Sequence, residues 1–486
     1  MNQRRLDNVF PNCPFIRGEK VTFKFEGRSI EGFKGEPLAM SLMASGVKVF
    51  GRSIKYHRPR GPICLRGHCN GCIMRVDGIP NQRTCEIPCT SGMEVERQIG
   101  WPGTGHDLFR VMDWVFADGM DHHSLFTSSG AVSKMAMGIV RKMSGFGQPP
   151  TADPLPINPI QTIEAQSVVI GAGVAGIQAS MALASEGYKV ILLEQGDKIG
   201  GQMLDRACVM KAGGDEIRPG WDVRQDVRKE FAEQDDIELH QKMPVVAVYS
   251  HKDYLQIIAT NDCETMDIRT NALVLANGAW DQVPLFQNND LPGIFSIQAL
   301  DRLVFGWGVV PGEPIAIYGN DDSTINLALE LNKAKVSIAA FITQRKPDEH
   351  TDRLKSAGIS VLHGYELHKA RGSKYISAIE LICGDEQNLV IDCGALGAEA
   401  PVAPSYELAH HAFCRVEFHS ESGYTVVTDE CGRTNDNRIF AAGRCAGATN
   451  PDSSWEQGKK AGMACALSIR PDEKLEDKLE NFCSGR

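Results

Sequence analysis

Alternating apolar and polar residues near the N-terminus predict two β-hairpins with a helix between them. Apolar positions alternate across residues 19–35 and are interrupted by Glu-Gly-Arg, which is a hairpin signal. Residues 35–47 then place apolar side chains at helical spacing. A second hairpin, across residues 73–88, turns at an Asp-Gly pair. The pattern therefore predicts a compact β-grasp module at this end of the chain.

The rest of the chain has the pattern of parallel α/β sheets. Residues 166–195 read as an apolar strand, a glycine turn, a helix and a second strand, which is the βαβ order. A second such unit begins at Pro314, and residues 437–469 give a strand, a loop and a closing helix. Between the N-terminal module and the first βαβ unit the pattern loosens, and the Pro-rich residues 149–159 predict an extended linker. A domain boundary is expected there.

Length, charge and cysteine content narrow the class of protein. A chain of 486 residues is too long for one core and suggests about three domains. It has no apolar run long enough for a membrane helix and no secretory signal, so we expect a cytoplasmic protein without a membrane span. A formal charge of -10 argues against nucleic acid as a partner. Fifteen cysteines in such a chain are expected to be thiols or metal ligands before disulfides.

Four of the cysteines have the spacing of an iron–sulfur site. Cys64-x4-Cys69-x2-Cys72 is the spacing with which a plant-type 2Fe-2S cluster takes three thiolates from one loop. The fourth ligand has to return from elsewhere, and Cys85 and Cys89 both lie within reach in the sequence. We favour Cys85, because it closes the second hairpin beside the loop, whereas Cys89 lies beyond a proline and needs a longer return.

A structural zinc site is the alternative use of four cysteines. Zinc sites usually pair one CxxC with another, and this spacing does not. Gly67 and Gly71 suit a tight loop whose amides turn towards cluster sulfurs. The cysteines elsewhere are scattered singly and are expected to be small buried residues. Electron transfer is therefore the expected chemistry of this module.

The first βαβ unit carries a dinucleotide signature. Gly171, Gly173 and Gly176 follow an apolar strand and open a helix, and Glu194 ends the next strand. The glycines allow a pyrophosphate to approach the helix N-terminus, and the Glu194 carboxylate can accept hydrogen bonds from adenosine ribose hydroxyls. Gly200-Gly201-Gln202 follows, where flavoproteins with two dinucleotide folds pass a loop along the pyrophosphate and flavin. FAD is the implied cofactor.

Two later segments resemble further flavoprotein signatures. Residues 271–284 form an apolar strand that ends in a small-residue turn, and residues 439–447 form a strand that reaches the ribityl chain. The residue that this strand delivers is usually Asp, and here it is Arg444. The closing helix is expected to begin after residues 455–458, with its N-terminal amides facing the flavin. The expected FAD contacts are Gly171, Gly173, Ala175, Gly176, Glu194, Gln195, Gly201, Gln202, Val245, Ala276, Asn277, Gly278, Gly443, Arg444 and Gln457.

The second βαβ unit departs from the nucleotide-binding pattern. Gly319 keeps the first glycine position, but Asp321 and Thr324 stand at the second and third. The second strand ends near Arg345 without the acidic residue that an NAD ribose requires. Binding of NAD(P) or another nucleotide stays open here, because a fold can persist without its ligand. The flavin and nucleotide segments contain no CxxC, so disulfide reduction beside the flavin is not expected.

Residues 51–89 resemble the ferredoxin-like portion of a group of multisubunit amine-oxidising enzymes. The group comprises sarcosine oxidase, opine dehydrogenase, dye-linked proline or hydroxyproline dehydrogenase and hydrogen cyanide synthase. Residues 167–202, 271–284 and 439–462 resemble the flavoprotein of their α subunit. The resemblance implies an α/β fold in which a β-grasp 2Fe-2S ferredoxin-like domain precedes a Rossmann-like flavoprotein of the pyridine-nucleotide-disulfide-oxidoreductase type.

The expected domains follow from these segments. They are 1–105 for the ferredoxin-like domain, 106–162 for a helical linker region, 163–300 for the first part of the FAD domain, 301–400 for the NAD-type Rossmann insert and 401–486 for the return segment with the C-terminal helix. The long C-terminal folate-type domain of the sarcosine oxidase α subunit is not expected, and the iron–sulfur and flavin segments share one polypeptide.

The resemblance also implies a division of work between subunits. In such complexes a separate β subunit holds another FAD, where the amine is oxidised. We therefore expect an α subunit that passes electrons between FAD and the 2Fe-2S cluster. Its expected partners are an FAD-containing β subunit, together with a further small electron-transfer subunit or an external acceptor. The substrate would be a secondary amine such as proline, hydroxyproline, sarcosine or an opine. A self-contained NAD(P)H-dependent flavin and iron–sulfur reductase, or a scaffold with vestigial sites, are the alternatives.

Overall fold

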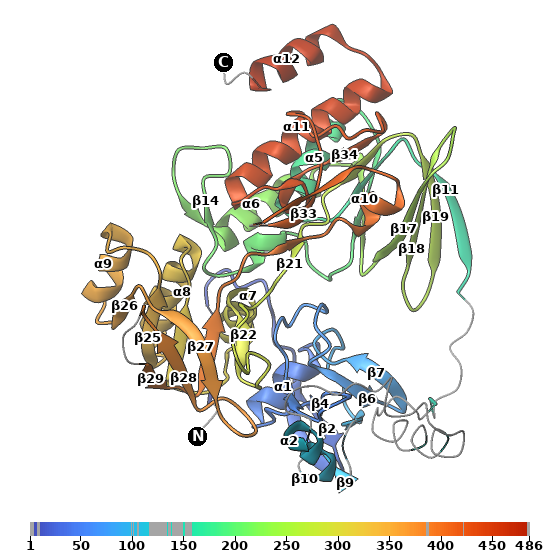
Figure 1. Ribbon diagram of the computed structural model, residues 1–486. Helices are drawn as coiled ribbons and strands as arrows, with labels where there is room; N and C mark the ends of the chain where they lie inside the picture. Colours follow the sequence, from blue (N-terminus) through green and yellow to red (C-terminus); the bar gives the residue numbers. More distant parts are fainter. Residues whose placement is uncertain are drawn as a thin grey trace. The chain divides into compact units, whose positions relative to one another are not determined.

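The computed structural model describes residues 4–6, 10–98, 100, 102–104, 106–115, 134, 138, 149–150, 158–384, 388–420 and 422–483. The chain forms two compact units, each assembled from two stretches of sequence (Figure 1). The first unit contains residues 1–154 and 282–400, and the second contains residues 155–281 and 401–486. The N-terminal module and the second βαβ unit therefore belong to the same body, and the first βαβ unit belongs to the other.

The N-terminal module is a β-grasp fold. Its elements are β2 (Lys20–Phe25), β3 (Arg28–Phe33), α1 (Leu38–Ala44), β4 (Gly51–Arg52), β5 (Pro59–Arg60), β6 (Ile73–Val76), β7 (Ile79–Arg83) and β8 (Glu94–Glu96). Five strands form one sheet in the order β3-β2-β8-β6-β7, with β2 and β8 parallel. Phe23 and Phe25 point to the core because alternate residues of a strand face the same side, and α1 packs against β3 with Leu38 and Leu42 buried.

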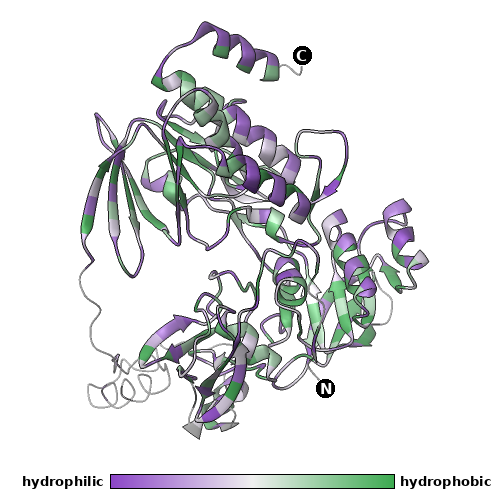
Figure 2. Ribbon diagram, turned by 180° about the vertical axis from the view of Figure 1, so that it is seen from behind, coloured by the Kyte–Doolittle hydropathy of each residue, from purple (hydrophilic) through white to green (hydrophobic). Residues whose placement is uncertain are grey.

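The second βαβ unit is a parallel sheet that carries helices, and one of its faces packs on the antiparallel strands of residues 366–392. Its elements are β22 (Ile294–Ser296), α7 (Ile297–Asp301), η3 (Arg302–Gly306), β24 (Ile315–Tyr318), α8 (Asp322–Lys333), β25 (Ile338–Thr343), α9 (Glu349–Ser356), β26 (Val361–His363) and β30 (Ala395–Ala398). The strand order is β22-β30-β24-β25-β26, and every neighbouring pair is parallel. Figure 2 shows these strands mostly in green and α9 largely in purple, as expected for a sheet buried on both faces.

Smaller elements complete the first unit. They are β1 (Arg4–Arg5), which pairs with β23 (Val309–Val310), β9 (Pro102–Gly103) with β10 (His106–Asp107), η1 (Leu108–Arg110), α2 (Val111–Val115), and the three-stranded meander of β27 (Glu366–Arg371), β28 (Ala378–Ile382) and β29 (Leu389–Asp392).

The second unit is built on the first βαβ unit. Its sheet has the order β16-β13-β12-β20-β34, entirely parallel, and its strands are β12 (Ser167–Ile170), β13 (Val190–Glu194), β16 (Ile237–Gln241), β20 (Leu273–Leu275) and β34 (Ile439–Ala441). Both faces of the sheet are buried. One face packs on α5 (Val174–Ser185), α6 (Gly220–Ala232) and α11 (Pro451–Ile469), and α12 (Glu473–Cys483) packs in turn on α11.

The opposite face packs on a four-stranded sheet, in which β11 pairs parallel with β19, one of the antiparallel strands β17 to β19, and on one short helix. These are β11 (Ile160–Glu164), β17 (Val245–Ser250), β18 (Leu255–Thr260), β19 (Thr265–Thr270) and α10 (Glu407–His411). Adjacent residues of β12 show the division, since Val169 faces the helices and Val168 faces the four-stranded sheet. The remaining elements are η2 (Gly201–Leu204), β14 (Val209–Met210), β15 (Arg218–Pro219), β21 (Ala279–Trp280), β31 (Ala403–Pro404), β32 (Val416–His419), β33 (Gly423–Val426) and η4 (Gly443–Ala446).

The predicted hairpins, βαβ units and final strand are present, but one predicted helix boundary was wrong. The closing helix α11 begins at Pro451, and residues 455–458 lie inside it. The Asn450 side chain caps it by accepting from the Ser453 amide, and a proline takes the first helical position, a start signal that sequence reasoning overlooked. Most of the expected linker region 106–162 lies outside the described residues. No helix in the described part of the chain is long and apolar enough to cross a membrane.

Candidate functional site

The cysteine loop brings the expected iron–sulfur ligands together. Cys64 and Cys72 are almost fully buried, and the Cys72 and Cys85 sulfurs lie 3.4 Å apart. The Cys64 thiol in turn hydrogen-bonds to the Cys69 thiol. Cys85 reaches the loop because it follows β7, which pairs antiparallel with β6 directly after Cys72. The predicted hairpin return is therefore observed.

Cys89 lies in a different environment. Its sulfur is close to Gly32 and Ser41, since a Cβ built on Gly32 would lie 3.0 Å from the Cys89 sulfur and 2.4 Å from the Ser41 hydroxyl oxygen. Burial raises the pKa of the Cys89 thiol to about 11. The Cys89 thiol is thus a protonated packing group between β3 and α1.

Backbone amides of the loop converge on sulfur. The amides of Arg66, His68 and Cys69 donate to the Cys64 sulfur at 3.5, 3.3 and 3.2 Å. Amide hydrogen bonds of this kind stabilise thiolate and tune the reduction potential of a cluster. Burial, together with the positive charge of Arg66 and Arg302, lowers the pKa of His68 to about 3, so its ring is neutral at pH 7.

The thiols are paired by hydrogen bonds. The hydrogen bond between the Cys64 and Cys69 thiols lowers the pKa of Cys69 to about 6, and the hydrogen bond between the Cys72 and Cys85 thiols lowers the pKa of Cys72. The pKa values of Cys64 and Cys85, the other members of the two pairs, are raised. Two of the four thiols are therefore already disposed to ionise, which is the state in which cysteine binds iron.

The second Rossmann sheet supports the cluster loop within the same unit. The Ser296 amide donates to the carbonyl of Ile63 at 3.1 Å, and the Arg60 guanidinium pairs with the Asp290 carboxylate. Gly71 is required beside this anchor, because a Cβ there would lie 2.0 Å from the Gly61 carbonyl oxygen. The Ser296 hydrogen bond and the Asp290 ion pair therefore anchor the cysteine loop to the second Rossmann unit.

The dinucleotide turn of the second unit fits a pyrophosphate. Gly171 has φ +98°, and a Cβ there would lie 2.4 Å from the Ala276 carbonyl oxygen. A Cβ on Gly176 would lie 1.8 Å from the Gly171 carbonyl oxygen, so this glycine sets the approach of α5 to the strand. At Gly173 the nearest atom to an added Cβ is 3.8 Å away, on Gly201. Two glycines therefore close the turn, and Gly173 leaves open the space that the pyrophosphate needs.

The adenosine side is built at the end of β13. The Glu194 carboxylate accepts from the amides of Ala172 and Gly196, each at 2.7 Å, which fixes it at the edge of the sheet where an adenosine ribose would bind. The Met243 amide donates to the Glu194 carbonyl at 2.9 Å, which brings the start of β17, and with it Val245, to the same edge of the sheet. Gln195 is exposed beside Glu194.

The loop after β13 meets the third flavoprotein signature. With the Gln202 amide oriented so that its oxygen faces Arg444, that oxygen accepts from Nη2 at 2.6 Å and from Nε at 3.3 Å. Arg444 thus binds a protein side chain in the place where this signature usually delivers Asp. The Gly201 backbone has φ +55° and its Cα approaches Gly173, so the loop lies against the dinucleotide turn.

The remaining expected contacts belong to the framework of the site. Asn277 donates from its side chain to the Ser405 carbonyl at 2.9 Å, next to Ala276 and to Gly278, whose φ is +74°. The Gly443 amide donates to the Gln457 side-chain oxygen at 3.0 Å. Ala175 lies against Gly443 and Gly458, where only a small side chain lets α11 approach α5.

Arg224 is a residue of this site that sequence reasoning missed. Its side chain is buried, its Nε donates to the Ile199 carbonyl at 2.7 Å, and it packs against Gly200. Burial lowers the pKa of Arg224 to about 10. It lies on α6, in a polar stretch of sequence that gives no local sign of burial, so only the tertiary contact reveals that it supports the Gly200 loop.

These two sites define a class of protein: a flavoprotein of two dinucleotide folds that carries its own iron–sulfur module. Residues 18–100 match the family model of a 2Fe-2S iron-sulfur cluster binding domain, and residues 165–465 match that of the pyridine nucleotide-disulphide oxidoreductases. The second match spans more than half of the chain, so the chain belongs to the pyridine nucleotide-disulphide oxidoreductase family. It is an FAD-dependent oxidoreductase with a 2Fe-2S domain, which confirms the expected fold class and both cofactors.

The chain is also similar in sequence to subunits of two oxidases. It is 26% identical over 424 residues to the alpha subunit of sarcosine oxidase from Rhizobium meliloti, a match that covers 81% of this chain and 41% of that protein. It is 23% identical to the A subunit of opine oxidase from Agrobacterium tumefaciens, covering 62% of this chain and 65% of the other. The chain thus spans less than two thirds of the length of these relatives.

A solved structure shares the fold over nearly the whole chain. L-Proline dehydrogenase from P. horikoshii superposes with a TM-score of 0.66 at 21% identity, covering 96% of this chain and 79% of that one. The expected resemblance to the sarcosine oxidase and opine oxidase group is therefore confirmed.

Proposed function

We propose that this protein is the electron-transferring α-type subunit of an amine dehydrogenase complex. The substrate would be a secondary amine such as proline, hydroxyproline, sarcosine or an opine, oxidised on a partner β subunit that holds a second FAD. A further small electron-transfer subunit or an external acceptor would complete the path. The complex would be cytoplasmic and would have no nucleic acid partner.

The observation that carries the proposal is that Cys64 contacts Cys69 and Cys72 contacts Cys85 at one loop, within a chain whose other unit is a flavin fold. Bound FAD supplies two-electron hydride chemistry and a 2Fe-2S cluster supplies one-electron transfer, so the pair connects the two. The sequence of the flavin and nucleotide segments has no CxxC, so this flavin has no dithiol partner of the disulfide-reductase kind. The names of the sarcosine oxidase and opine oxidase relatives mark both of them as subunits.

Different residues of this chain would hold the cluster and the FAD. The four thiolates would hold iron, and the amides of the cysteine loop would stabilise the charge on sulfur. The turn around Gly173 would bind the FAD pyrophosphate, and Glu194 would orient the adenosine ribose. Arg444, held by Gln202, would add positive charge beside the flavin phosphates.

Native purification tests this proposal. The complex isolated from its source should contain this chain, a second flavoprotein chain, iron and flavin, and should reduce an artificial dye when a secondary amine is added. This chain expressed alone should bind both cofactors and fail to oxidise any of the four amines. A native preparation that contains this chain alone and turns over an amine would contradict the division of work.

The competing function is an NAD(P)H-dependent reductase, which requires nucleotide binding at the second Rossmann unit. Mixing the oxidised, isolated chain with NADH or NADPH and recording the flavin absorbance distinguishes the two. Under our proposal the flavin stays oxidised.

A further inference from the structure

The turn after β24 is the place where a Rossmann unit normally receives a nucleotide pyrophosphate. It runs from Gly319 to Thr324 and leads into α8, whose N-terminal amides and helix dipole favour a negative charge. This unit belongs to a family named for its pyridine nucleotide, so an NAD(P) site is the expectation. The residues that surround the turn decide whether the site can be used.

A carboxylate of the chain itself already sits at this turn. The Glu399 oxygen Oε2 accepts from the amides of Asn320 and Asp321, at 3.1 and 3.0 Å, and from the Thr324 hydroxyl at 2.5 Å. Glu399 directly follows β30, the neighbour of β24 in the sheet, so the parallel register delivers it to the same edge. Three donors that would bind a phosphate oxygen are thereby satisfied internally.

Gly319 shows how closely the carboxylate fills the turn. A Cβ at this position would lie 2.4 Å from Glu399 Oε2 and 2.7 Å from the Thr324 methyl carbon. The glycine retained from the nucleotide-binding pattern therefore admits the Glu399 side chain. It leaves no room for a pyrophosphate at the same place.

Further negative charge surrounds the turn. Asp321 is close enough to raise the pKa of the Glu399 carboxyl, although burial raises it more. Asp322 lies in the first turn of α8, where it offsets the helix dipole. A dinucleotide pyrophosphate would meet like charges at a helix end that its own acids already stabilise.

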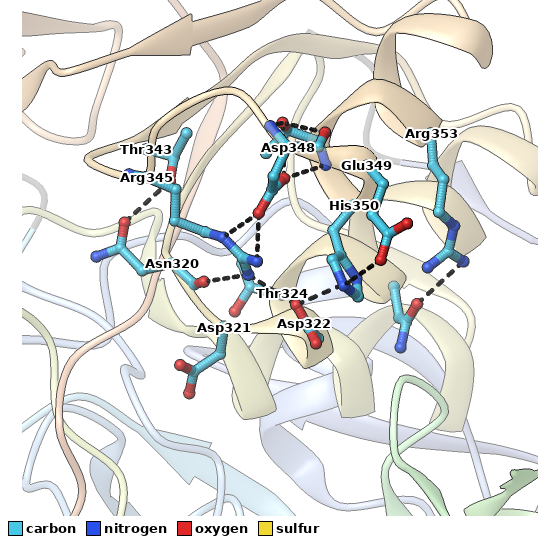
Figure 3. A network of polar contacts seen from close by, with 12 residues as sticks. Asn320, Asp321, Asp322, Thr324, Thr343, Arg345, Asp348, Glu349, His350 and Arg353 are labelled. Carbon is cyan, nitrogen blue, oxygen red and sulfur yellow. Dashed lines mark hydrogen bonds and ion pairs between the residues drawn. The ribbon is translucent and has the colours of Figure 1, made fainter.

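The cation that could bind an adenosine phosphate is also engaged. Arg345, at the end of β25, donates to Asp322 at 2.7 Å, to Asp348 at 2.5 Å and to the carbonyl of Asn320 at 2.9 Å (Figure 3). The Asn320 side-chain oxygen accepts in turn from the Thr343 hydroxyl and the Gln344 amide, each at 2.9 Å. The network fixes both sides of the turn in one arrangement.

We infer that the second Rossmann unit does not bind NAD(P), because the Glu399 carboxylate occupies the phosphate position of its turn. The unit keeps the fold and has exchanged the ligand for an internal one. The second Rossmann unit keeps a structural role. Its β22 edge anchors the cluster loop through the Ser296 amide and the Arg60–Asp290 pair. The electrons of this protein then enter from a donor other than NAD(P)H. This inference stands whether or not the donor is an amine.

Direct binding to the full chain, loaded with FAD and the cluster, tests the inference. Isothermal titration calorimetry with NADH, NADPH and ADP should show no saturable binding up to about 1 mM, a range that would detect even weak nucleotide sites. ADP carries the pyrophosphate and adenosine without the nicotinamide, and bound FAD blocks the other dinucleotide turn. Saturable binding of NADH or NADPH at lower concentrations would overturn the inference.

Removing the Glu399 carboxylate should free the phosphate position of the turn after β24. Glu399→Ala frees the two amides and the Thr324 hydroxyl, and we expect ADP to bind this variant with a dissociation constant at least tenfold below the roughly 1 mM at which the unaltered chain shows no saturation. Glu399→Ser, which keeps a short polar side chain, serves if the alanine variant does not fold. Glu349→Ala is the matched control, because it removes one exposed carboxylate from the same unit and should leave ADP binding unchanged. A folded Glu399 variant that gains no ADP binding would overturn the role of the carboxylate.

Discussion

At the scale of single residues, Cys85 and Cys89 carry the same chemistry in different surroundings. The Cys85 sulfur lies 3.4 Å from that of Cys72, whereas the Cys89 thiol packs between β3 and α1 near Ser41. The sequence favoured Cys85 from the length of a hairpin, and the contact agrees with that preference. The assignment of the fourth ligand stays a prediction until iron is measured.

Replacing Cys85 and Cys89 by alanine, one at a time, tests which of them is the fourth ligand. Cys85→Ala should reduce the iron content from about two atoms per chain to nearly none and remove the cluster's visible absorbance, because one ligand is lost. Cys89→Ala should keep the iron and lose only about 1 kcal/mol of unfolding free energy, since it deletes a small buried group. Iron analysis and visible spectra of both variants decide the matter. The opposite result, with iron lost only from the Cys89 variant, would make Cys89 the ligand.

At the scale of elements, the packing of α5 against α11 forms part of the hydrophobic core of the flavin unit. Figure 1 shows α5 and α11 side by side. They approach closely because Gly458 and Gly462 face Ala175 and Ala179. A Cβ on Gly462 would lie 2.5 Å from the Ala179 carbonyl oxygen and 2.8 Å from its Cα. These neighbours are backbone atoms, so they cannot rotate away as a side-chain end can.

Gly462→Ala should therefore destabilise the unit although alanine favours helices. The intrinsic preference is worth about 1 kcal/mol, whereas overpacking a helix contact costs about 1 to 3 kcal/mol and displaces α11. We expect a net loss of up to about 2 kcal/mol in urea unfolding and weaker retention of FAD, because α11 carries Gln457, the partner of the Gly443 amide.

Glu456→Ala, at an exposed position of the same helix, is the control and should change neither quantity. Equal stability of the glycine variant and the unaltered chain would show that α11 has room to move.

At the scale of the whole molecule, the two redox sites belong to two separately packed units. The cysteine loop lies in the unit that contains the second Rossmann sheet, and the FAD signatures lie in the unit built on β12 and α5. Each unit has its own hydrophobic core, so loss of one cofactor should affect mainly its own unit.

Removal of iron tests this separation. A cluster contributes to the stability of the loop that binds it, so its removal with a chelator and a reductant should increase hydrogen exchange in residues 64–85. Peptides from β12 and α5 should keep their protection, and the bound FAD should remain. Mass spectrometry of exchanged peptides measures both regions in one experiment. Equal loss of protection in both units would show that they fold as one.

The order of the residues was enough to predict the main elements and both cofactor classes, because hydrophobic periodicity and short motifs are local properties. Cysteine spacing indicated the iron–sulfur module, and the glycines around Gly173 indicated the dinucleotide turn. Local signals also predicted the closing strand and helix, although the helix start was misplaced since the Asn450 cap was overlooked.

What fills each glycine turn, and what supports it, became visible only in the folded chain. Glu399 lies 75 positions after Thr324 and accepts a hydrogen bond from the Thr324 hydroxyl. Arg224, on α6, packs against Gly200 and supports its loop. No local pattern marks either residue, because each contact depends on which strands become neighbours in a sheet and which helix faces pack. The same glycine turn thus leaves room for a cofactor in one unit and is closed by a carboxylate in the other.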